Sequence, residues 1–316
     1  MSKTKIRNSI WSVLFEGIKI YISNIDKFVL YMLFPVFGQV IGLALTFGLT
    51  IGLAGKVAQK ANSMTSALIF IFLLAIPGLL IFLKAFWDYM VAYVALNSMT
   101  QGALTTGRVY DFQSHREVAT RRAFKYIGFL IAIGVLTLGL SLCTIVPILG
   151  LIPPLIIWIY LILVYQVFTF EEDLSIKECF SRSYELVKGD WGRTFLLMLI
   201  LGFFSIYIIT IGVTVIFDLF NLTPIISSVF DIVGTSLPLD FINKAFNYLH
   251  LKTITVEFIS ETIFTCVLGT IVAGLSLPIR SICYTLWYAN LSYLKDSNNG
   301  DKPKKVRKSK KNKEEE

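Results

Sequence analysis

The feature that most constrains this chain is an uninterrupted run, 28–54, of 27 residues without Asp, Glu, Lys or Arg. About 20 apolar residues in a helix are enough to cross the ~30 Å hydrocarbon core of a bilayer. Five further apolar stretches follow, and two of them are expected to continue as helix beyond a charged residue. The six expected spans are 28–54, 67–97, 126–146, 155–170, 194–217 and 262–293.

Charge is scarce in the chain and concentrated at one end. Charged residues are 16% of the 316, and 14 of the 50 lie within 295–316, whereas a soluble domain carries about 25%. This composition excludes a disordered chain and argues against a water-soluble globule. The sequence therefore predicts an all-α polytopic membrane helix bundle of about six transmembrane helices with amphipathic interfacial helices. We expect an integral membrane domain over 1–294 and a disordered basic tail over 295–316.

The basic residues of the connections predict the orientation. With six spans, the N-terminal segment, two alternate connections and the tail carry 23 Lys and Arg, and the opposite side carries four. Cytoplasmic segments have the excess of Lys and Arg. We therefore expect both termini in the cytoplasm and the chain in the plasma (inner) membrane. The tail, with eight basic residues in 302–313, is expected to attract anionic lipid; it lacks aromatic residues for base stacking, so no nucleic acid is expected.

Segment 222–250 is the main ambiguity in this topology. It is apolar but interrupted by charges and bounded by prolines, and each piece is of a length typical of interfacial or re-entrant helices. We interpret it as two short amphipathic helices on the outer surface, with a seventh span as the alternative.

Amphipathic segments precede three of the spans on the predicted cytoplasmic side. In the clearest, 175–189, Ser175 and Glu178 have the spacing of a capping box and Gly189 suits the C-terminal cap. Its apolar stripe can lie in lipid or against the bundle, and both remain open. These helices also offer a surface for a protein partner.

Three charged residues within the spans form the candidate intramembrane polar site: Lys84, Asp88 and Arg280. Ionisable groups inside spans face protein or water, and residues at i and i+4 share a helix face, so Lys84 and Asp88 can pair. If the two helices touch, Arg280 can also reach Asp88. The sequence leaves two interpretations: a polar cavity for transport, or cations at the level of the inner headgroups.

The first span carries two Gly-x3-Gly pairs, Gly38 with Gly42 and Gly48 with Gly52. Such small faces let helices approach closely. We expect packing inside the bundle, with homodimerisation as the alternative.

The sequence contains no recognisable catalytic arrangement. His115, Arg116 and Glu117 suggest the His-Arg start of a phosphodiesterase, but the other histidine, His250, is predicted on the opposite side of the membrane, and metal-dependent hydrolysis needs clustered ligands. We expect His115 to be a solvated loop residue. We also expect no enzyme activity, no metal and no cofactor.

Two stretches carry a family resemblance: 183–195 (SYELVKGDWGRTF), which leads into a span, and 277–291 (LPIRSICYTLWYANL). Together they resemble a group of bacterial multi-pass membrane proteins that includes the membrane domain associated with glycerophosphodiester phosphodiesterases. Members end in a Tyr-Tyr-Asp-Leu-Arg type motif, and this chain lacks its acidic and basic pair. The resemblance implies a bacterial inner-membrane protein without a settled activity.

These observations lead to two hypotheses of function. The first is a multi-pass inner-membrane protein without catalytic site, acting as a structural or partner-binding module of unknown specific role. The second is a transporter or lipid-handling protein with a polar intramembrane cavity lined by Lys84, Asp88 and Arg280.

Overall fold

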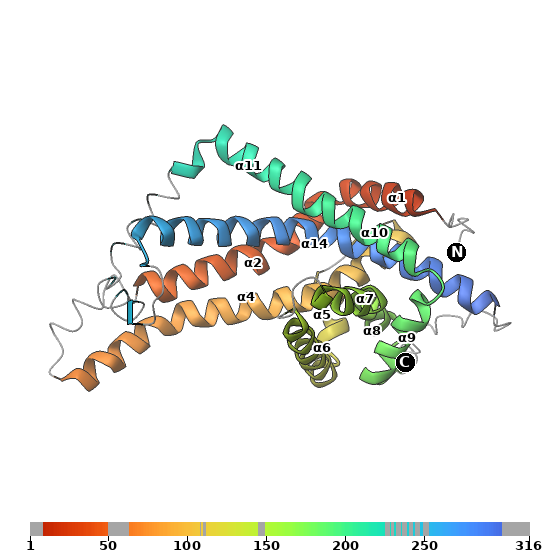
Figure 1. The fold of residues 1–316 in the computed structure, drawn as a ribbon, viewed down its shortest axis with the longest axis horizontal. Helices are drawn as coiled ribbons and strands as arrows, with labels where there is room; N and C mark the ends of the chain where they lie inside the picture. Colours follow the sequence, from red (N-terminus) through yellow and green to blue (C-terminus); the bar gives the residue numbers. More distant parts are fainter. Residues whose placement is uncertain are drawn as a thin grey trace, which may run out of the picture. The chain divides into compact units, whose positions relative to one another are not determined.

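The structure, a computed structural model, is almost entirely helical over the residues that it describes. These are 9–49, 63–107, 109, 112–144, 149–224 and 253–298, with isolated residues between 228 and 248. They contain no β-strand (Figure 1). The helices are α1 (Ile10–Ser23), α2 (Ile25–Leu43), the π-helix η1 (Ala44–Leu49), α4 (Met64–Thr106), α5 (Phe112–Thr120), α6 (Ala123–Cys143), the 3-10 turn η2 (Leu149–Leu151), α7 (Ile152–Leu161), α8 (Val164–Phe170), α9 (Ile176–Val187), α10 (Trp191–Phe203), the π-helix η3 (Phe204–Ile208), α11 (Ile209–Leu219) and α14 (Val256–Asn298).

Six helical segments of the described residues are long and apolar enough to cross a membrane. They are Ile25–Thr46, Ile69–Thr106, Ala123–Cys143, Ile152–Phe170, Trp191–Leu219 and Val256–Lys295. Each overlaps one of the six expected spans. The predicted fold class, an all-α polytopic bundle of about six transmembrane helices, is confirmed.

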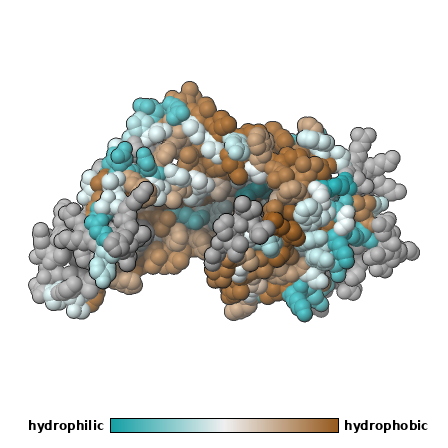
Figure 2. Space-filling model, in the orientation of Figure 1, coloured by the Kyte–Doolittle hydropathy of each residue, from teal (hydrophilic) through white to brown (hydrophobic). Residues whose placement is uncertain are grey.

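The outer surfaces of these helices are apolar, as lipid requires. On α6, for example, Ile131, Val135, Leu138 and Leu142 recur every three or four residues, and each is at least 60% exposed. Figure 2 shows such apolar surface in brown on the side of the helices that faces the viewer. Exposing an apolar stripe of this kind to water costs free energy, whereas exposing it to the hydrocarbon of a membrane does not.

The chain divides into two compact units, each assembled from separate stretches. The first comprises 1–19, 122–198 and 282–316, and the second 20–121 and 199–281. Each unit is described by itself below.

In the second unit, α2 packs closely on α4 through the small residues of the first span. A Cβ added to Gly38 would lie 2.8 Å from the Ala85 Cβ, and one added to Gly42 would lie 2.5 Å from the Phe82 backbone nitrogen. The Gly38–Gly42 face is therefore used inside the bundle, as expected. Gly52 lies outside the described residues, so the second glycine pair stays a prediction.

Helix α4 is much longer than a membrane span. Its 43 residues would extend about 65 Å at 1.5 Å per residue. Ser63 caps its start by accepting a hydrogen bond from the Ser66 backbone nitrogen, and Gly107, with φ 69°, ends it. The helix runs through Pro77 and continues past Lys84, as predicted. Helix α14 is equally long and runs through Pro278.

In the first unit, α6, α7, α8 and α9 enclose an aromatic core. The rings of Phe129 and Phe168 are stacked with centroids 4.6 Å apart, and Tyr126 and Phe180 adjoin them. The apolar stripe of α9 faces this core, because Cys179, Leu186 and Val187 are fully buried. Of the two alternatives left open for this stripe, the structure places it against the bundle.

The ends of the helices differ from the sequence-based bounds in instructive ways. Helix α7 begins at Ile152, before the expected 155, because Pro153 and Pro154 occupy the first turn, where a missing N–H costs nothing. The fourth span is also interrupted, since a turn at 162–163 separates α7 from α8. The predicted surface helices over most of 222–250, and nearly all of the basic tail, lie outside the described residues.

Candidate functional site

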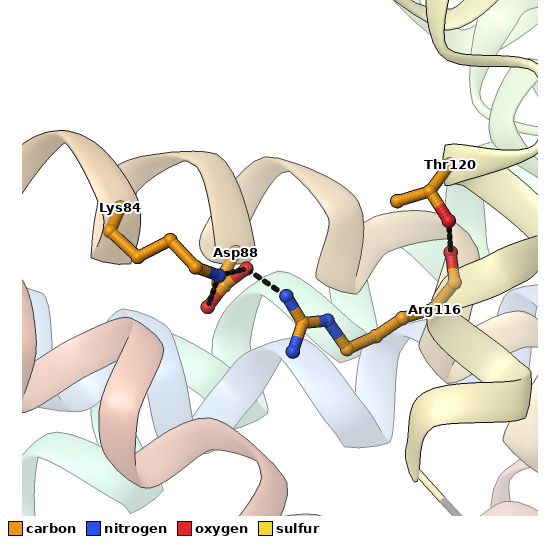
Figure 3. Close-up of polar contacts among 4 residues, drawn as sticks. All are labelled: Lys84, Asp88, Arg116 and Thr120. Carbon is orange, nitrogen blue, oxygen red and sulfur yellow. Dashed lines mark hydrogen bonds and ion pairs between the residues drawn. The ribbon is translucent and has the colours of Figure 1, made fainter.

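Asp88 and Lys84 form the centre of a charged cluster in the second unit. They lie four residues apart on α4, and the Lys84 ammonium donates to both carboxylate oxygens of Asp88 at 2.6 Å (Figure 3). The side chain of Asp88 is only 8% exposed, whereas that of Lys84 is 52% exposed. The structure therefore brings these two predicted residues together on one helix face.

A second cation reaches the same carboxylate from another helix. Arg116, on α5, donates through Nη2 to Oδ1 of Asp88 at 2.6 Å (Figure 3). The Arg116 side chain is 37% exposed. Its backbone carbonyl accepts a hydrogen bond from the Thr120 hydroxyl one turn further on. Two cations thus share one buried anion, which leaves a formal charge of +1 on the three side chains.

Neighbouring aromatic and polar contacts hold α5 at this position. The ring of Tyr31 on α2 meets that of Phe112 edge-on, with centroids 5.3 Å apart. The Ser98 hydroxyl lies 2.9 Å from Nδ1 of His115. The expectation of a solvated loop for His115 was wrong: it is part of α5, because the segment forms a helix that packs on α4.

Arg280, the third predicted residue, has a different environment. Helices α4 and α14 do touch, since the Ser281 hydroxyl donates to Oδ1 of Asn97 at 2.6 Å. Among the described residues, however, no ion pair joins Arg280 to Asp88, and Nε of Arg280 is buried without a hydrogen-bond acceptor. Its guanidinium lies within electrostatic range of Tyr89, the residue after Asp88.

Sequence reasoning missed Arg116 as a member of this cluster. In the sequence, Arg116 is one of the basic residues that predict the orientation and lies between His115 and Glu117, and no pattern there assigns it to the intramembrane polar site. One clue was available: the spans hold one acidic residue, Asp88, beside two basic ones, and an amphipathic segment rich in arginine follows the same helix.

A second polar cluster, in the first unit, centres on Glu171 directly after α8. Arg182 on α9 donates through Nε to Oε1 of Glu171 at 3.1 Å, and the Tyr288 hydroxyl on α14 donates to the same oxygen at 2.9 Å. The Tyr288 ring also stacks on Phe170 with centroids 5.4 Å apart. This carboxylate therefore ties three helices together.

The two stretches that carry the family resemblance meet in the same unit. Trp287, fully buried on α14, donates through Nε1 to the Thr194 hydroxyl at 3.0 Å. The Arg193 guanidinium lies 5.3 Å from the Trp287 ring centroid, a cation–π arrangement. Further along, Lys295 donates to the Lys188 carbonyl at 2.8 Å. Nothing in the sequence indicated that these stretches, about 90 residues apart, touch.

The amphipathic helix α9 begins with the predicted capping box. The Ser175 backbone nitrogen donates to Oε2 of Glu178 at 2.7 Å, and the Glu178 backbone nitrogen donates to Oγ of Ser175 at 3.4 Å. These hydrogen bonds hold the pKa of the Glu178 carboxyl below its usual value. Gly189, with φ 99°, follows the helix as expected. Burial raises the pKa of the Cys179 thiol on the inner face of α9.

Within the described part of the chain, no three His, Cys, Asp or Glu side chains come together as metal ligands would. The polar groups that do converge are cations around a carboxylate, a combination suited to holding helices together or to attracting anions.

The fold and these clusters define an all-α multi-pass membrane protein whose charged side chains join its helices. Comparisons of the chain with protein families, with curated proteins and with solved structures find no match.

Proposed function

We propose that this protein is a non-enzymatic module of the bacterial inner membrane that presents a helical surface on its cytoplasmic side to a protein partner. The observation that carries the proposal is the two-sided character of α9. Its inner face is closed against its own unit, while Lys177, Ser181 and Glu185 remain exposed on its outer face. An exposed helix face with charges of both signs can dock a partner of complementary charge.

The charged clusters support a structural role for the membrane part. Asp88 joins α4 to α5, and Glu171 joins the end of α8 to α9 and α14. Because each carboxylate is already engaged by two donors, these groups stabilise a fixed arrangement of helices. This differs from an acid–base pair that waits for substrate.

The family resemblance and the orientation belong to the same proposal. The acidic and basic pair of the resembled C-terminal motif is absent from 277–291, but Glu171 and Arg182 lie beside Tyr288 instead. The distribution of Lys and Arg favours cytoplasmic termini. The α9 surface then faces the cytoplasm, and the basic tail attracts anionic lipid at the same leaflet.

Site-specific photo-crosslinking in cells tests the partner surface. A photoreactive amino acid at position 181, on the outer face of α9, is expected to give a discrete protein adduct. The matched control is position 138 on α6, where Leu138 is 67% exposed on an apolar surface and lipid adducts are expected. If position 181 also gives lipid adducts only, the proposal fails.

The second candidate, a transporter or lipid-handling protein, is favoured by one observation. Nε of Arg280 is buried without an acceptor, and ionisable groups inside spans mark the substrate pathways of many transporters. Reconstitution into vesicles that contain a fluorescent phospholipid tests lipid handling. Transfer of the lipid between leaflets that disappears in Arg280→Gln would favour this candidate over the module.

A further inference from the structure

The cluster around Asp88 carries more positive charge than the protein itself neutralises. Lys84 and Arg116 share one carboxylate, so one positive charge remains uncompensated. An excess of cations in a partly buried site attracts an anion.

Both cations retain donors that can bind such an anion. An arginine has five N–H donors, and the hydrogen bond from Nη2 to Asp88 uses one of those of Arg116. The Lys84 side chain is 52% exposed and that of Arg116 is 37% exposed. Figure 3 shows the Lys84 ammonium and the Arg116 guanidinium both at the Asp88 carboxylate, and both side chains keep exposed surface that a ligand can reach.

The depth of the cluster indicates which anion is available. Lys84 lies 17 residues after Ala67, where the apolar part of the span begins, which corresponds to about 26 Å of helix. This is close to the far boundary of a ~30 Å hydrocarbon core. Arg116 is held at the same level by Asp88, on the helix that precedes the span Ala123–Cys143. Lipid phosphates lie at this level of the membrane.

We propose that Lys84 and Arg116 bind the phosphate of an anionic membrane phospholipid, with Asp88 holding the two cations in place. The proposal does not depend on the partner surface of α9. The chemistry is that of a phosphate between an arginine fork and a lysine. A soluble phosphate monoester has the same chemistry, and the experiment has to separate the two sources.

The test measures lipid binding to the purified full-length protein by native mass spectrometry. Phosphatidylglycerol is titrated against phosphatidylcholine, whose headgroup has no net charge. We expect the wild-type protein to prefer phosphatidylglycerol. Lys84→Gln and Arg116→Gln should each weaken that binding about fivefold, as expected for loss of one charge-assisted hydrogen bond to the phosphate.

The matched control is Arg121→Gln. Arg121 follows α5, is 77% exposed and pairs with Glu117, so its loss changes the net charge equally outside the cluster. The basic tail is present in every variant and cancels from the comparison. We expect Arg121→Gln to bind phosphatidylglycerol within about twofold of wild type.

Two results would overturn the proposal. In one, Lys84→Gln and Arg116→Gln bind phosphatidylglycerol as well as Arg121→Gln does, which would show that the cluster is not the binding site. In the other, glycerol 3-phosphate displaces phosphatidylglycerol at equal concentration, which shows that the ligand is a soluble phosphate. Because Lys84 is half exposed, Lys84→Gln keeps the fold and decides the question if Arg116→Gln does not fold.

Discussion

At the scale of single residues, the three members of the charged cluster contribute unequally to stability. Asp88 is buried and serves two cations, whereas Lys84 is half exposed and makes an i,i+4 pair. Removing a buried charge leaves its partners uncompensated, but an exposed pair contributes little. We therefore expect a large loss of stability when Asp88 is replaced and a small loss when Lys84 is replaced.

We expect Asp88→Asn to lower the free energy of unfolding by about 2 kcal/mol, less than for a fully buried pair because both cations can reach water. Lys84→Gln should cost about 0.5 kcal/mol or less. Unfolding followed by intrinsic fluorescence in detergent measures both. Equal costs for the two variants would contradict this account of the cluster.

Sequence reasoning at this scale succeeded where the partners were local. Lys84 and Asp88 were paired from helix periodicity alone, because residues at i and i+4 must share a face. The contact from Arg116 depends on how α5 folds back on α4, which no local pattern specifies. For the same reason, the hydrogen bond between Trp287 and Thr194 could not be predicted from the sequence.

At the scale of helices, the close approach of α2 and α4 depends on glycine. A methyl group at position 42 would meet the backbone nitrogen and Cα of Phe82 at 2.5 and 2.7 Å. Backbone atoms cannot move aside as a side chain can, so the helices must separate.

We therefore expect Gly42→Ala to lower the free energy of unfolding by about 1–3 kcal/mol, the usual cost of overpacking. Gly134→Ala on α6 is the matched control, because nothing lies within 4 Å of its added methyl group. The control should be neutral or slightly stabilising, since alanine is the better helix former. Thermal unfolding of the two variants side by side measures the difference, and a neutral Gly42→Ala would be inconsistent with the packing.

The capping box of α9 predicts a pH dependence of stability. Hydrogen bonds from Ser175 lower the pKa of Glu178 from its ordinary value of 4.5. A carboxyl whose pKa is lower in the folded state adds stability above the unfolded pKa and loses it as the pH falls toward the folded one. The contribution of Glu178 should thus be complete at neutral pH and disappear below pH 4.5.

Glu178→Gln isolates this contribution, because glutamine keeps an acceptor oxygen but does not titrate in this range. We expect the wild-type protein to unfold at a higher temperature than Glu178→Gln at about pH 6, and the gap to close as the pH is lowered to about 3. If the difference in unfolding temperature stays constant over this range, the effect of Glu178→Gln comes from packing and not from the charge of the carboxylate.

Helix ends were the least predictable feature at this scale. The capping box and Gly189 of α9 can be predicted because each depends on residues that lie close together in the sequence. The early start of α7 and its break before α8 were missed. The start of α7 is ambiguous because prolines occur both in turns and in the first turn of a helix. The break at 162–163 is not predictable because it contains no glycine or proline.

At the scale of the whole molecule, the six spans among the described residues follow from the lengths of the apolar stretches in the sequence. Apolar stretches long enough to cross a bilayer have few alternatives, because every backbone polar group in lipid must be satisfied within a helix or barrel. The division into two units was not predictable, since both are assembled from distant stretches of the chain. Their membership depends on side-chain contacts between helices.

The orientation of the molecule in the membrane is the remaining prediction at this scale, and a native cysteine can be used to test it. Cys143 is the last residue of α6 and is exposed. Because α6 follows a basic connection, the distribution of Lys and Arg predicts that Cys143 faces the outside. A membrane-impermeant thiol reagent should therefore label the wild-type protein on intact cells.

Moving the thiol to the tail should abolish that labelling. In the variant that combines Cys143→Ser with Ser309→Cys, we expect no reaction on intact cells and full reaction after the membrane is opened, because the basic tail is predicted to stay in the cytoplasm. Cys143→Ser alone is the control for the other three cysteines, of which Cys179 and Cys283 are buried. Labelling of position 309 on intact cells would reverse the orientation. It would also place the outer face of α9 on the side where no cytoplasmic partner can reach it.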